Sequence, residues 1–301
     1  MRPASGLRPE VYRALVGAKQ LCDRLGLSRL PGYGGLRRLV KRAVAQSLGE
    51  LGDPSLTIKV GGARLRIPSR FTPHYLYRRY EPVTTAWSLR ALKRGDRVAD
   101  VGAHIGYYTV LAARRVGAAG LVHAVEPCEE NLRYLRCNVE ANGLANVRIH
   151  AAAAGARAGR RLLQVTESSD SHGFYAHPLA TTRSTVEVAV QTLDALVGAP
   201  VRLVKIDVEG AEIDVLDGLR PLLRRTQGQM TFIVEWNPAC ARAAGHDPED
   251  VVWALKDLGI QRLTVLDDHL GRPRPLEETL RDVRSRQLPV SWYVNLWGER
   301  D

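Results

Sequence analysis

The amino-acid sequence predicts an α/β protein built on an open, doubly wound sheet. From about residue 81 onward, short apolar runs alternate with helical segments that end at glycines. Strands that alternate with helices of this length require parallel crossovers, which place helices on both faces of the sheet. The chain has 301 residues, of which 45% are hydrophobic and 25% charged, so it can bury a large core. This length fits one large domain with an extension, or two small domains.

The first 75 residues are expected to form an N-terminal extension of helices and a β-hairpin. Helical segments up to about residue 50 are interrupted at LPGYGG, residues 30–35. Two short alternating runs then flank Gly61 and Gly62, which predicts a hairpin. We therefore divide the chain into an extension over residues 1–75 and a main domain over residues 76–301.

The net charge of +11 comes mostly from arginine, a bias that GC-rich coding produces without selection for binding. No nucleic-acid partner is therefore expected. The basic run RRLVKRAV, residues 37–44, fits either a solvated helix face or weak contact with an anionic membrane. No apolar run approaches the ~20 residues of a bilayer span, and residues 1–17 contain no apolar signal-peptide core. These features predict a cytoplasmic protein.

The main domain is expected to begin with a helix over residues 84–96 and a strand over residues 97–101. The elements that follow alternate in the same way. In chain order they are a helix (105–117), a strand (121–126), a helix (128–143), a strand (146–154), a strand (201–210), a helix (211–225), a strand (229–237), a helix (248–259), a strand (260–267) and a strand (289–298). The last strand follows its predecessor without a long helix, which predicts that it runs antiparallel.

A segment of forty residues, about 155–195, interrupts this alternation. It contains two runs of strand character, RRLLQV and STVEVAV, on either side of a polar loop with serines and histidines. Irregular segments of this length inside a compact domain are usually functional. We interpret it as an insertion that contributes to an acceptor site.

The stretch DVGAHIG, residues 100–106, lies where the first strand of the main domain becomes a helix. Such a turn directs backbone N–H groups to the carboxyl edge of the sheet, where open α/β sheets bind ligands. Gly102 and Gly106 leave room for a ligand to approach the backbone. A tight turn that needs glycine for packing has the same sequence, so this signal alone leaves both interpretations open.

Glu126 and Pro127 follow the second strand, about twenty residues after the glycines. A carboxylate at this position can accept both hydrogen bonds from a ribose diol, which indicates an adenosine-containing cofactor. The glycine spacing differs from the G-x-G-x-x-G of dinucleotide sites, and Asp100 beside the turn repels phosphate. The pattern therefore favours S-adenosylmethionine, with a nicotinamide-dependent oxidoreductase as the alternative.

Six segments carry a resemblance to a known family. In chain order they are DVGAHIGYYT, VEP, CNVEANGLANV, TLDAL, KIDVEGAEIDVLDG and VEWNP. With them the chain, from about residue 80 onward, resembles the FkbM-type S-adenosylmethionine-dependent methyltransferases. The resemblance implies a class I methyltransferase (Rossmann-like) fold, a sheet of seven strands with the last antiparallel. It also implies methyl transfer to oxygen, typically to a hydroxyl of a sugar, a glycolipid or a polyketide-like natural product of secondary metabolism.

The cofactor site is predicted at the carboxyl edge of the first strands, with Glu81 reaching the cofactor ammonium. The resembling family usually has asparagine where this chain has His104, whose side chain could still donate to the cofactor carboxylate. The residues assigned to S-adenosylmethionine are Glu81, Asp100, Gly102, Ala103, His104, Gly106, Glu126, Pro127 and Asp207.

Catalytic roles are assigned to acids at the ends of the later strands and to one histidine. An alcohol is a poor nucleophile at neutral pH, so a base, a metal or strong hydrogen bonding is expected. Asp207 is placed at the donor–acceptor junction, with Glu209 supporting it or capping the following helix. Glu235 orients the acceptor or pairs with an arginine, and His172 in the polar loop is the candidate base. A divalent metal is possible here but is not favoured.

An RNA-directed methyltransferase ranks below the other functions, because only 6% of the residues are aromatic and none alternates with a basic run. The expected acceptor is a small or glycosylated molecule.

Four cysteines lie far apart without C-x-x-C spacing, so they are expected to be reduced and structural. They are Cys22, Cys128, Cys137 and Cys240.

Overall fold

A computed structural model describes residues 55–68 and 80–300 of the chain. The chain divides into two compact units, residues 1–60 with 64–80 and residues 61–63 with 81–301, and each is described by itself. The helices predicted before residue 50 and the basic run 37–44 lie outside the described residues.

The predicted hairpin is present. Strands β1 (Ser55–Val60) and β2 (Ala63–Pro68) form a two-stranded sheet joined by Gly61 and Gly62. Both glycines have positive φ, 54° and 78°, as a two-residue turn between twisted strands requires.

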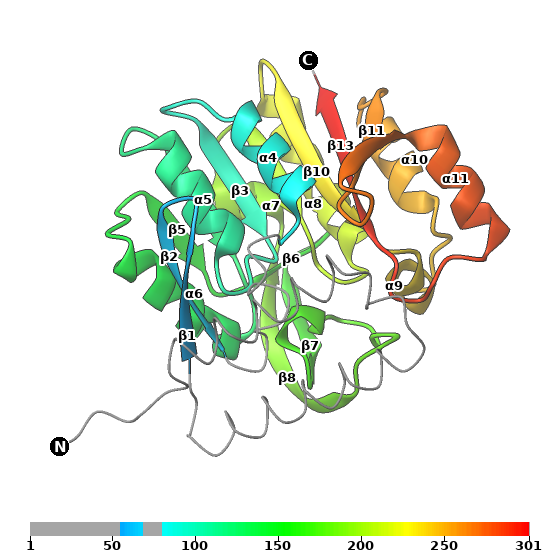
Figure 1. Cartoon of the computed structure of the whole chain (residues 1–301), viewed down its shortest axis with the longest axis horizontal. Coiled ribbons are helices and arrows are strands. Elements are labelled where there is room, and N and C mark those ends of the chain that lie inside the picture. Colours follow the sequence, from blue (N-terminus) through cyan, green and yellow to red (C-terminus); the bar gives the residue numbers. More distant parts are fainter. Residues whose placement is uncertain (1–54, 69–79, 301) are drawn as a thin grey trace, which may run out of the picture. The chain divides into compact units, whose positions relative to one another are not determined.

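The main domain contains the predicted doubly wound sheet (Figure 1). Its strands lie in the order β12-β11-β13-β10-β9-β3-β4-β5. Their bounds are β3 (Arg97–Val101), β4 (Leu121–Val125), β5 (Val147–His150), β9 (Leu203–Ile206), β10 (Met230–Trp236), β11 (Leu263–Asp267), β12 (Arg272–Pro275) and β13 (Val294–Arg300). The five central strands from β10 to β5 are parallel, and β13 runs antiparallel between β10 and β11. The fold class is confirmed, with the short edge strand β12 added to the seven predicted strands.

Helices cover both faces of this sheet. They are α4 (Pro82–Ala91), α5 (Tyr107–Val116), α6 (Glu129–Ala141), α7 (Leu193–Val197), α8 (Glu212–Arg225), α9 (Pro238–Ala243), α10 (Asp250–Asp257) and α11 (Leu276–Ser285). Neighbouring residues of β9 belong to different core clusters: Leu203 packs with Val116 of α5, and Val204 packs with Leu216 of α8. Because side chains alternate along a strand, α5 and α8 cover opposite faces.

One premise of the sequence analysis was wrong. The last strand was expected to follow its predecessor without a long helix, but α11 lies between them. The antiparallel direction of β13 is nevertheless correct, because the chain turns back through β12 before α11 and returns into the gap between β10 and β11.

The segment over residues 155–195 contains the two predicted strands. They are β7 (Gly159–Thr166) and β8 (Thr182–Gln191), which pair antiparallel and form a small sheet with β6 (Ala153–Ala154). The loop between β7 and β8 contains a short 3-10 turn, Ser169–Ser171. A Cβ at Gly173 of this loop would lie 3.1 Å from the carbonyl oxygen of Glu209, so the loop packs against the turn after β9.

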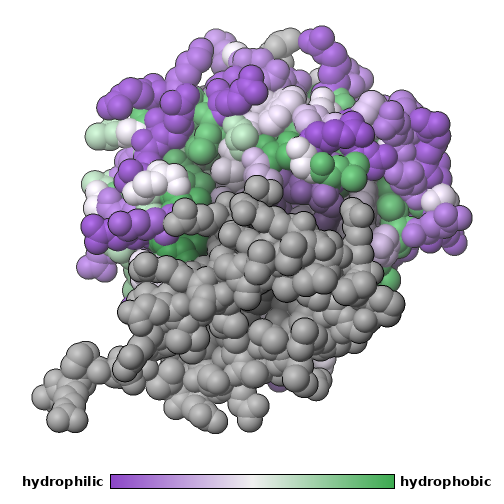
Figure 2. All heavy atoms as spheres, in the orientation of Figure 1, coloured by the Kyte–Doolittle hydropathy of each residue, from purple (hydrophilic) through white to green (hydrophobic). Residues whose placement is uncertain are grey.

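The surface of the described residues is mainly polar in the view of Figure 2, with smaller hydrophobic areas between hydrophilic side chains. In the ranges 55–68 and 80–300, none of the helices combines the length and the apolar character needed to cross a bilayer.

Candidate functional site

The predicted glycine turn connects β3 to α5 at the carboxyl edge of the sheet. A Cβ on Gly102 would lie 1.7 Å from the carbonyl oxygen of Asp207, and one on Gly106 would lie 2.6 Å from Cδ1 of Leu135. Both glycines also have left-handed φ values of 80° and 89°. Close packing within the chain is therefore sufficient to require glycine at both positions.

The N–H groups of this turn were expected to be free for a ligand, but three of them donate within the chain. Gly102 and Ala103 both donate to the carbonyl oxygen of Val125 at 3.0 Å, and Gly106 donates to Ala103 at 2.8 Å. The turn folds back onto the end of β4, which occupies these groups. These three N–H groups are therefore satisfied within the chain.

Glu126 is the central side chain on this half of the edge. It is only 4% exposed and follows β4 directly. Its Oε2 accepts from the N–H of His104 at 2.8 Å, and its Oε1 accepts from the N–H of Cys128 at 2.9 Å and from Asn131 at 3.3 Å. These bonds fix the carboxylate at the start of α6. Burial raises its pKa to about 7 although the hydrogen bonds lower it.

His104 has a left-handed backbone, with φ of 51°. Asparagine adopts this conformation more readily than histidine, which is consistent with the residue usual in the resembling family. The ring nitrogen Nε2 lies 2.6 Å from Oγ of Ser169 in the insertion, so His104 links the glycine turn to the β7–β8 loop. Burial lowers the pKa of His104 to about 4, which makes the ring neutral at physiological pH. Pro127 lies next to Glu126 in the loop that leads to α6.

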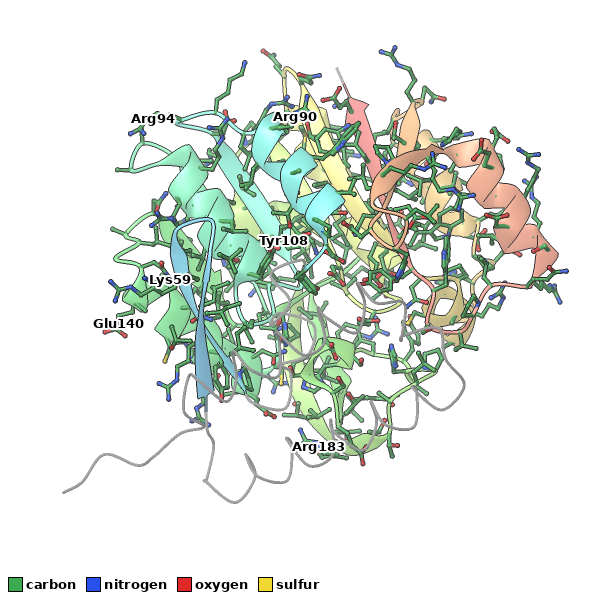
Figure 3. All side chains as sticks on the ribbon, viewed as in Figure 1. Lys59, Arg90, Arg94, Tyr108, Glu140 and Arg183 are labelled. Atoms are coloured by element: carbon green, nitrogen blue, oxygen red, sulfur yellow. The ribbon has the colours of Figure 1, made fainter. Side chains whose placement is uncertain are left out.

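Lys205 lies at the centre of a group of acids. Its Nζ is 2.6 Å from Oδ2 of Asp207 and 4.6 Å from the ring centre of Tyr108. Burial acts to lower the pKa of Lys205, but the carboxylates of Asp207, Glu81 and Asp100 together raise it. Figure 3 labels Tyr108 near the middle of the main domain, and Arg90 and Arg94 near the top of the view, away from Tyr108.

Glu81 and Asp100 are buried on either side of this lysine. The Tyr108 hydroxyl donates to Oε2 of Glu81 at 2.6 Å, and Asn295 of β13 donates to Oε1 at 3.4 Å. Burial raises the pKa of Glu81 to about 7. Asp100 accepts from Thr109 at 2.6 Å, and burial raises its pKa as well. Glu81 can therefore exchange a proton near neutral pH.

The predicted catalytic acids come together. The carboxylates of Asp207, Glu209 and Glu235 have oxygens within 4.8 Å of one another. Glu235 is only 6% exposed, and within the described chain its Oε1 accepts no hydrogen bond. Burial raises the pKa of Glu235 well above its usual range, and the nearby acids, Asp207 first, raise it further.

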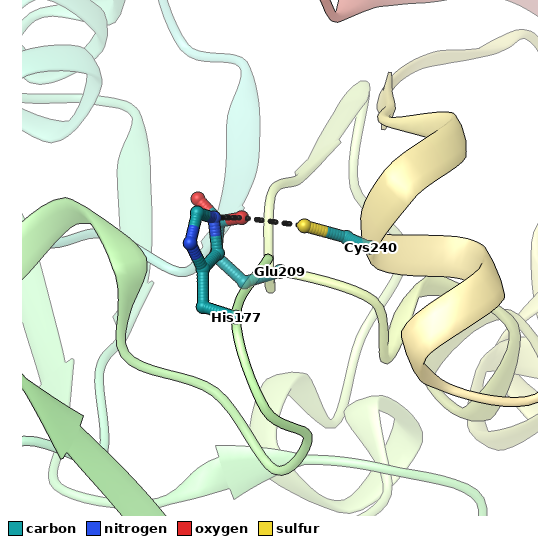
Figure 4. A group of neighbouring side chains, drawn as sticks. All are labelled: His177, Glu209 and Cys240. Carbon is teal, nitrogen blue, oxygen red and sulfur yellow. Dashed lines mark hydrogen bonds and ion pairs between the residues drawn. The ribbon is translucent and has the colours of Figure 1, made fainter. Parts of the chain in front are cut away.

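Glu209 is held by two residues that the sequence analysis did not assign to the site. Nε2 of His177 lies 3.4 Å from Oε2 of Glu209, and the thiol of Cys240 donates to the same oxygen at 3.4 Å (Figure 4). The capping role considered for Glu209 is wrong, since the N-cap of α8 is Ala211 and receives no side-chain hydrogen bond. Glu212 braces the turn before α8, where its Oε1 accepts from the N–H groups of Val208 and Gly210 at 3.2 Å.

His172 makes its hydrogen bond inside the insertion, where its Nδ1 accepts from the N–H of Thr166 at 3.1 Å. The histidine that reaches the acids is His177, five residues later in the same polar loop. The sequence signal for His177 was this loop itself, which contains both histidines. Cys240 and Asn295 gave no such signal, because their neighbours at the site are far away in sequence.

The donor set indicates the charge of the ligand that would fit this edge. The carboxyl groups of Glu81, Asp100 and Asp207 act on the buried Lys205. Glu209 and Glu235 lie beside Asp207, and Oε1 of Glu235 has no partner among the described residues. Asp207 already pairs with the lysine, so a pyrophosphate gains little there, whereas a ligand with a sulfonium and an ammonium is attracted by the ionised carboxylates. The residues present therefore fit S-adenosylmethionine better than a dinucleotide.

The sequence of residues 100–259 matches the family described as the methyltransferase FkbM domain. This match covers more than half of the chain. The chain belongs to the FkbM methyltransferase family. The KIDVEGAE segment, with Asp207, Glu209 and Glu212, and the glycine turn both lie inside the matched residues.

Solved structures with a similar fold include three methyltransferases. One is the FkbM methyltransferase from Methylobacillus flagellatus, with 15% identity, a TM-score of 0.41, and coverage of 67% of this chain and 43% of that one. Another is a methyltransferase from Streptococcus mutans in complex with SAH, with 13% identity, a TM-score of 0.43, and coverage of 73% and 97%. The third is an O-methyltransferase from Thermotoga maritima, with 17% identity, a TM-score of 0.43, and coverage of 85% and 80%.

This chain therefore spans less than half of the length of the Methylobacillus protein. No curated protein matches the sequence. The family assignment rests on the sequence match over residues 100–259.

Proposed function

We propose that this FkbM-family methyltransferase uses S-adenosylmethionine to methylate a hydroxyl group of a small or glycosylated acceptor. The observation that carries this proposal is the arrangement of buried acids along one edge of the sheet. Glu126 lies buried at the end of β4, Asp207 pairs with Lys205 at the end of β9, and Glu209 and Glu235 lie next to Asp207. The first position suits a nucleoside, and the second suits a reacting hydroxyl.

The donor half of the site would hold the nucleoside. Each oxygen of Glu126 already accepts an N–H of the chain, and a carboxylate oxygen has capacity for a further bond. Oε2 of Glu126 can therefore accept from one ribose hydroxyl as it stands, and a second hydroxyl would replace the long 3.3 Å contact of Asn131 with Oε1. The cofactor ammonium would lie near Glu81, whose carboxylate is fixed by Tyr108.

The acceptor half would hold the hydroxyl close to the methyl group. The acceptor oxygen forms a bond to the methyl carbon while the carbon–sulfur bond breaks, and the electron pair of that bond stays on sulfur. The hydroxyl proton passes to a carboxylate of the Asp207 and Glu235 group. A carboxyl group with a raised pKa, as in Glu235, is a stronger base once ionised. Positioning of the two reactants contributes the larger share of the rate.

The acceptor class follows from the family resemblance and from the insertion. The β7–β8 loop packs against the turn after β9, which supports a role for its polar residues in acceptor binding. A polar loop of this kind fits a sugar, a glycolipid or another hydroxylated natural product of secondary metabolism. A cytoplasmic location is part of the same proposal.

Calorimetric titration of the full chain tests the cofactor assignment. S-adenosylhomocysteine should bind with one site per chain, and NAD should give no binding heat under the same conditions. If NAD binds and S-adenosylhomocysteine does not, the nicotinamide alternative is the better one.

Screening of hydroxylated acceptors with methyl-labelled S-adenosylmethionine then tests the direction of transfer. Label recovered as a methyl ether supports the proposal. Label found only on nitrogen or carbon contradicts transfer to oxygen.

A further inference from the structure

Side chains of three types that can bind metals come together next to Asp207 and Glu235. His177 comes from the β7–β8 loop, Glu209 from the turn after β9, and Cys240 from helix α9 (Figure 4). Their donor atoms, one nitrogen, one oxygen and one sulfur, all lie within 4.8 Å of one another. Glu209 is 31 residues from Cys240 and 32 residues from His177 in sequence, so the three side chains meet only in the folded chain. We call these three residues the His–Glu–Cys cluster.

The distances inside the His–Glu–Cys cluster suit a shared cation. Oε2 of Glu209 lies 3.4 Å from Nε2 of His177 and 3.4 Å from Sγ of Cys240. The first distance is longer than a good N–H···O hydrogen bond of about 2.7–3.2 Å. Ligands bound to zinc at about 2.0–2.3 Å in tetrahedral geometry lie roughly 3.3–3.7 Å apart. The observed separations therefore match two edges of such a tetrahedron.

Glu235 provides a second, independent observation that favours a cation beside Glu209. Only 6% of Glu235 is exposed, and its Oε1 has no hydrogen-bond partner in the part of the chain that the structure describes. Its carboxylate lies within 4.8 Å of an oxygen of Glu209. A buried carboxylate oxygen without a partner is costly, and a cation next to Glu209 would remove that cost.

Cys240 is buried, with 2% of the residue exposed, and its Sγ lies 3.4 Å from Oε2 of Glu209. The sulfur is therefore positioned to share an ion with Glu209.

We propose that His177, Glu209 and Cys240 bind one divalent transition-metal ion of the zinc type, with the neighbouring Glu235 able to complete or neutralise the site. A thiolate and an imidazole select zinc over magnesium or calcium, which prefer sites made only of oxygen ligands. Three protein ligands leave a position for an exchangeable oxygen ligand. The suggestion that an acceptor hydroxyl takes that position rests on the proposed function, whereas metal binding itself does not.

Cobalt spectroscopy on the full-length protein tests the site directly. Protein stripped with a chelator and titrated with Co²⁺ should take up one ion per chain and develop a thiolate-to-cobalt charge-transfer band. Zn²⁺ should displace the cobalt and remove the band. Calorimetry of Zn²⁺ binding in two buffers of different ionisation enthalpy should show release of the Cys240 proton.

Variants assign the ligands. Cys240→Ser should abolish the charge-transfer band, while Cys128→Ala, which removes another buried thiol, should leave the band unchanged. Glu209→Gln and His177→Ala should each weaken Zn²⁺ binding by at least the ~10–100-fold that loss of an outer partner costs. Equal thermal unfolding midpoints of the chelator-treated variants show that each has folded.

Two results would overturn the inference. One is Zn²⁺ binding that is unchanged in Cys240→Ser and in His177→Ala. The other is binding of Mg²⁺ alone, without a charge-transfer band. Titration with S-adenosylhomocysteine on the same samples separates the two proposals: cofactor binding without zinc binding rejects only the metal site, and zinc binding without cofactor binding rejects only the proposed function.

Discussion

The two halves of the acidic edge differ in how far the chain satisfies its own polar groups. At the end of β4, Glu126 accepts three hydrogen bonds and the N–H groups of the glycine turn are occupied. At the ends of β9 and β10, the acids share one lysine and Glu235 keeps an unpartnered oxygen. The polar groups of the first half are fixed by the chain itself. The second half retains a buried oxygen that a ligand or an ion could engage, as proposed above.

Loss of Lys205 should have the largest effect, a decrease in the free energy of unfolding. Lys205→Met leaves Asp207 and the nearby acids without their buried cation, which should lower the free energy of unfolding by about 3–5 kcal/mol. Urea unfolding of the ligand-free chain measures it. Lys93→Met, at an exposed position, should change stability by less than about 0.5 kcal/mol. A loss of similar size in both variants would show that Lys205 does not hold the acids together.

The donor half should respond through ligand affinity. Glu126→Ala should weaken S-adenosylhomocysteine binding by about a hundredfold or more, because two hydrogen bonds to a carboxylate contribute ~1.5–3 kcal/mol each. Calorimetry checks this against Glu140→Ala, an exposed acid on α6 labelled in Figure 3, which should bind normally. Unchanged affinity in Glu126→Ala would remove the ribose assignment.

The pH dependence of stability should reveal the buried acid in the donor half. Burial raises the pKa of Glu126 from 4.5 to about 7, so the folded chain holds this proton more tightly than the unfolded chain. The stability that this group contributes is present below pH 4.5 and is lost as the pH rises toward 7. Between pH 5 and 7 the wild type should lose about 1–3 kcal/mol relative to Glu126→Gln.

Urea unfolding of both proteins at several pH values measures this difference. Parallel curves for the wild type and Glu126→Gln would mean that the Glu126 carboxyl is not perturbed by folding.

The smallest expected effect concerns His104. His104→Asn replaces a residue in a left-handed conformation by one that adopts it more easily, but it removes the contact with Ser169. The two effects oppose each other, so the free energy of unfolding should change by less than about 1 kcal/mol. Thermal unfolding measures the change. A loss of several kcal/mol would show that the link to the insertion controls the stability of this edge.

The sheet and the donor half were largely predictable from sequence, because they depend on local patterns. Apolar strands, helix-ending glycines and the position of Glu126 after a strand are short-range features, and parallel strands follow from the alternation with helices. The helix α11 was missed. It lies between β12 and β13, which both pair with β11 and not with each other.

The acceptor half was predictable only in part. Asp207, Glu209 and Glu235 end neighbouring strands, so their meeting follows from the sheet. His177 and Cys240 reach Glu209 from a loop and from a short helix, and no sequence spacing records where those segments pack. The occupied N–H groups of the glycine turn also depend on how tightly the turn folds back onto β4.

The most direct test of the central claim is a crystal structure of the full chain with S-adenosylhomocysteine. The account predicts that both ribose hydroxyls donate to Glu126 and that the sulfur faces Asp207 across the carboxyl edge of the sheet. A nucleoside bound elsewhere, or a ribose with no contact to Glu126, would contradict it.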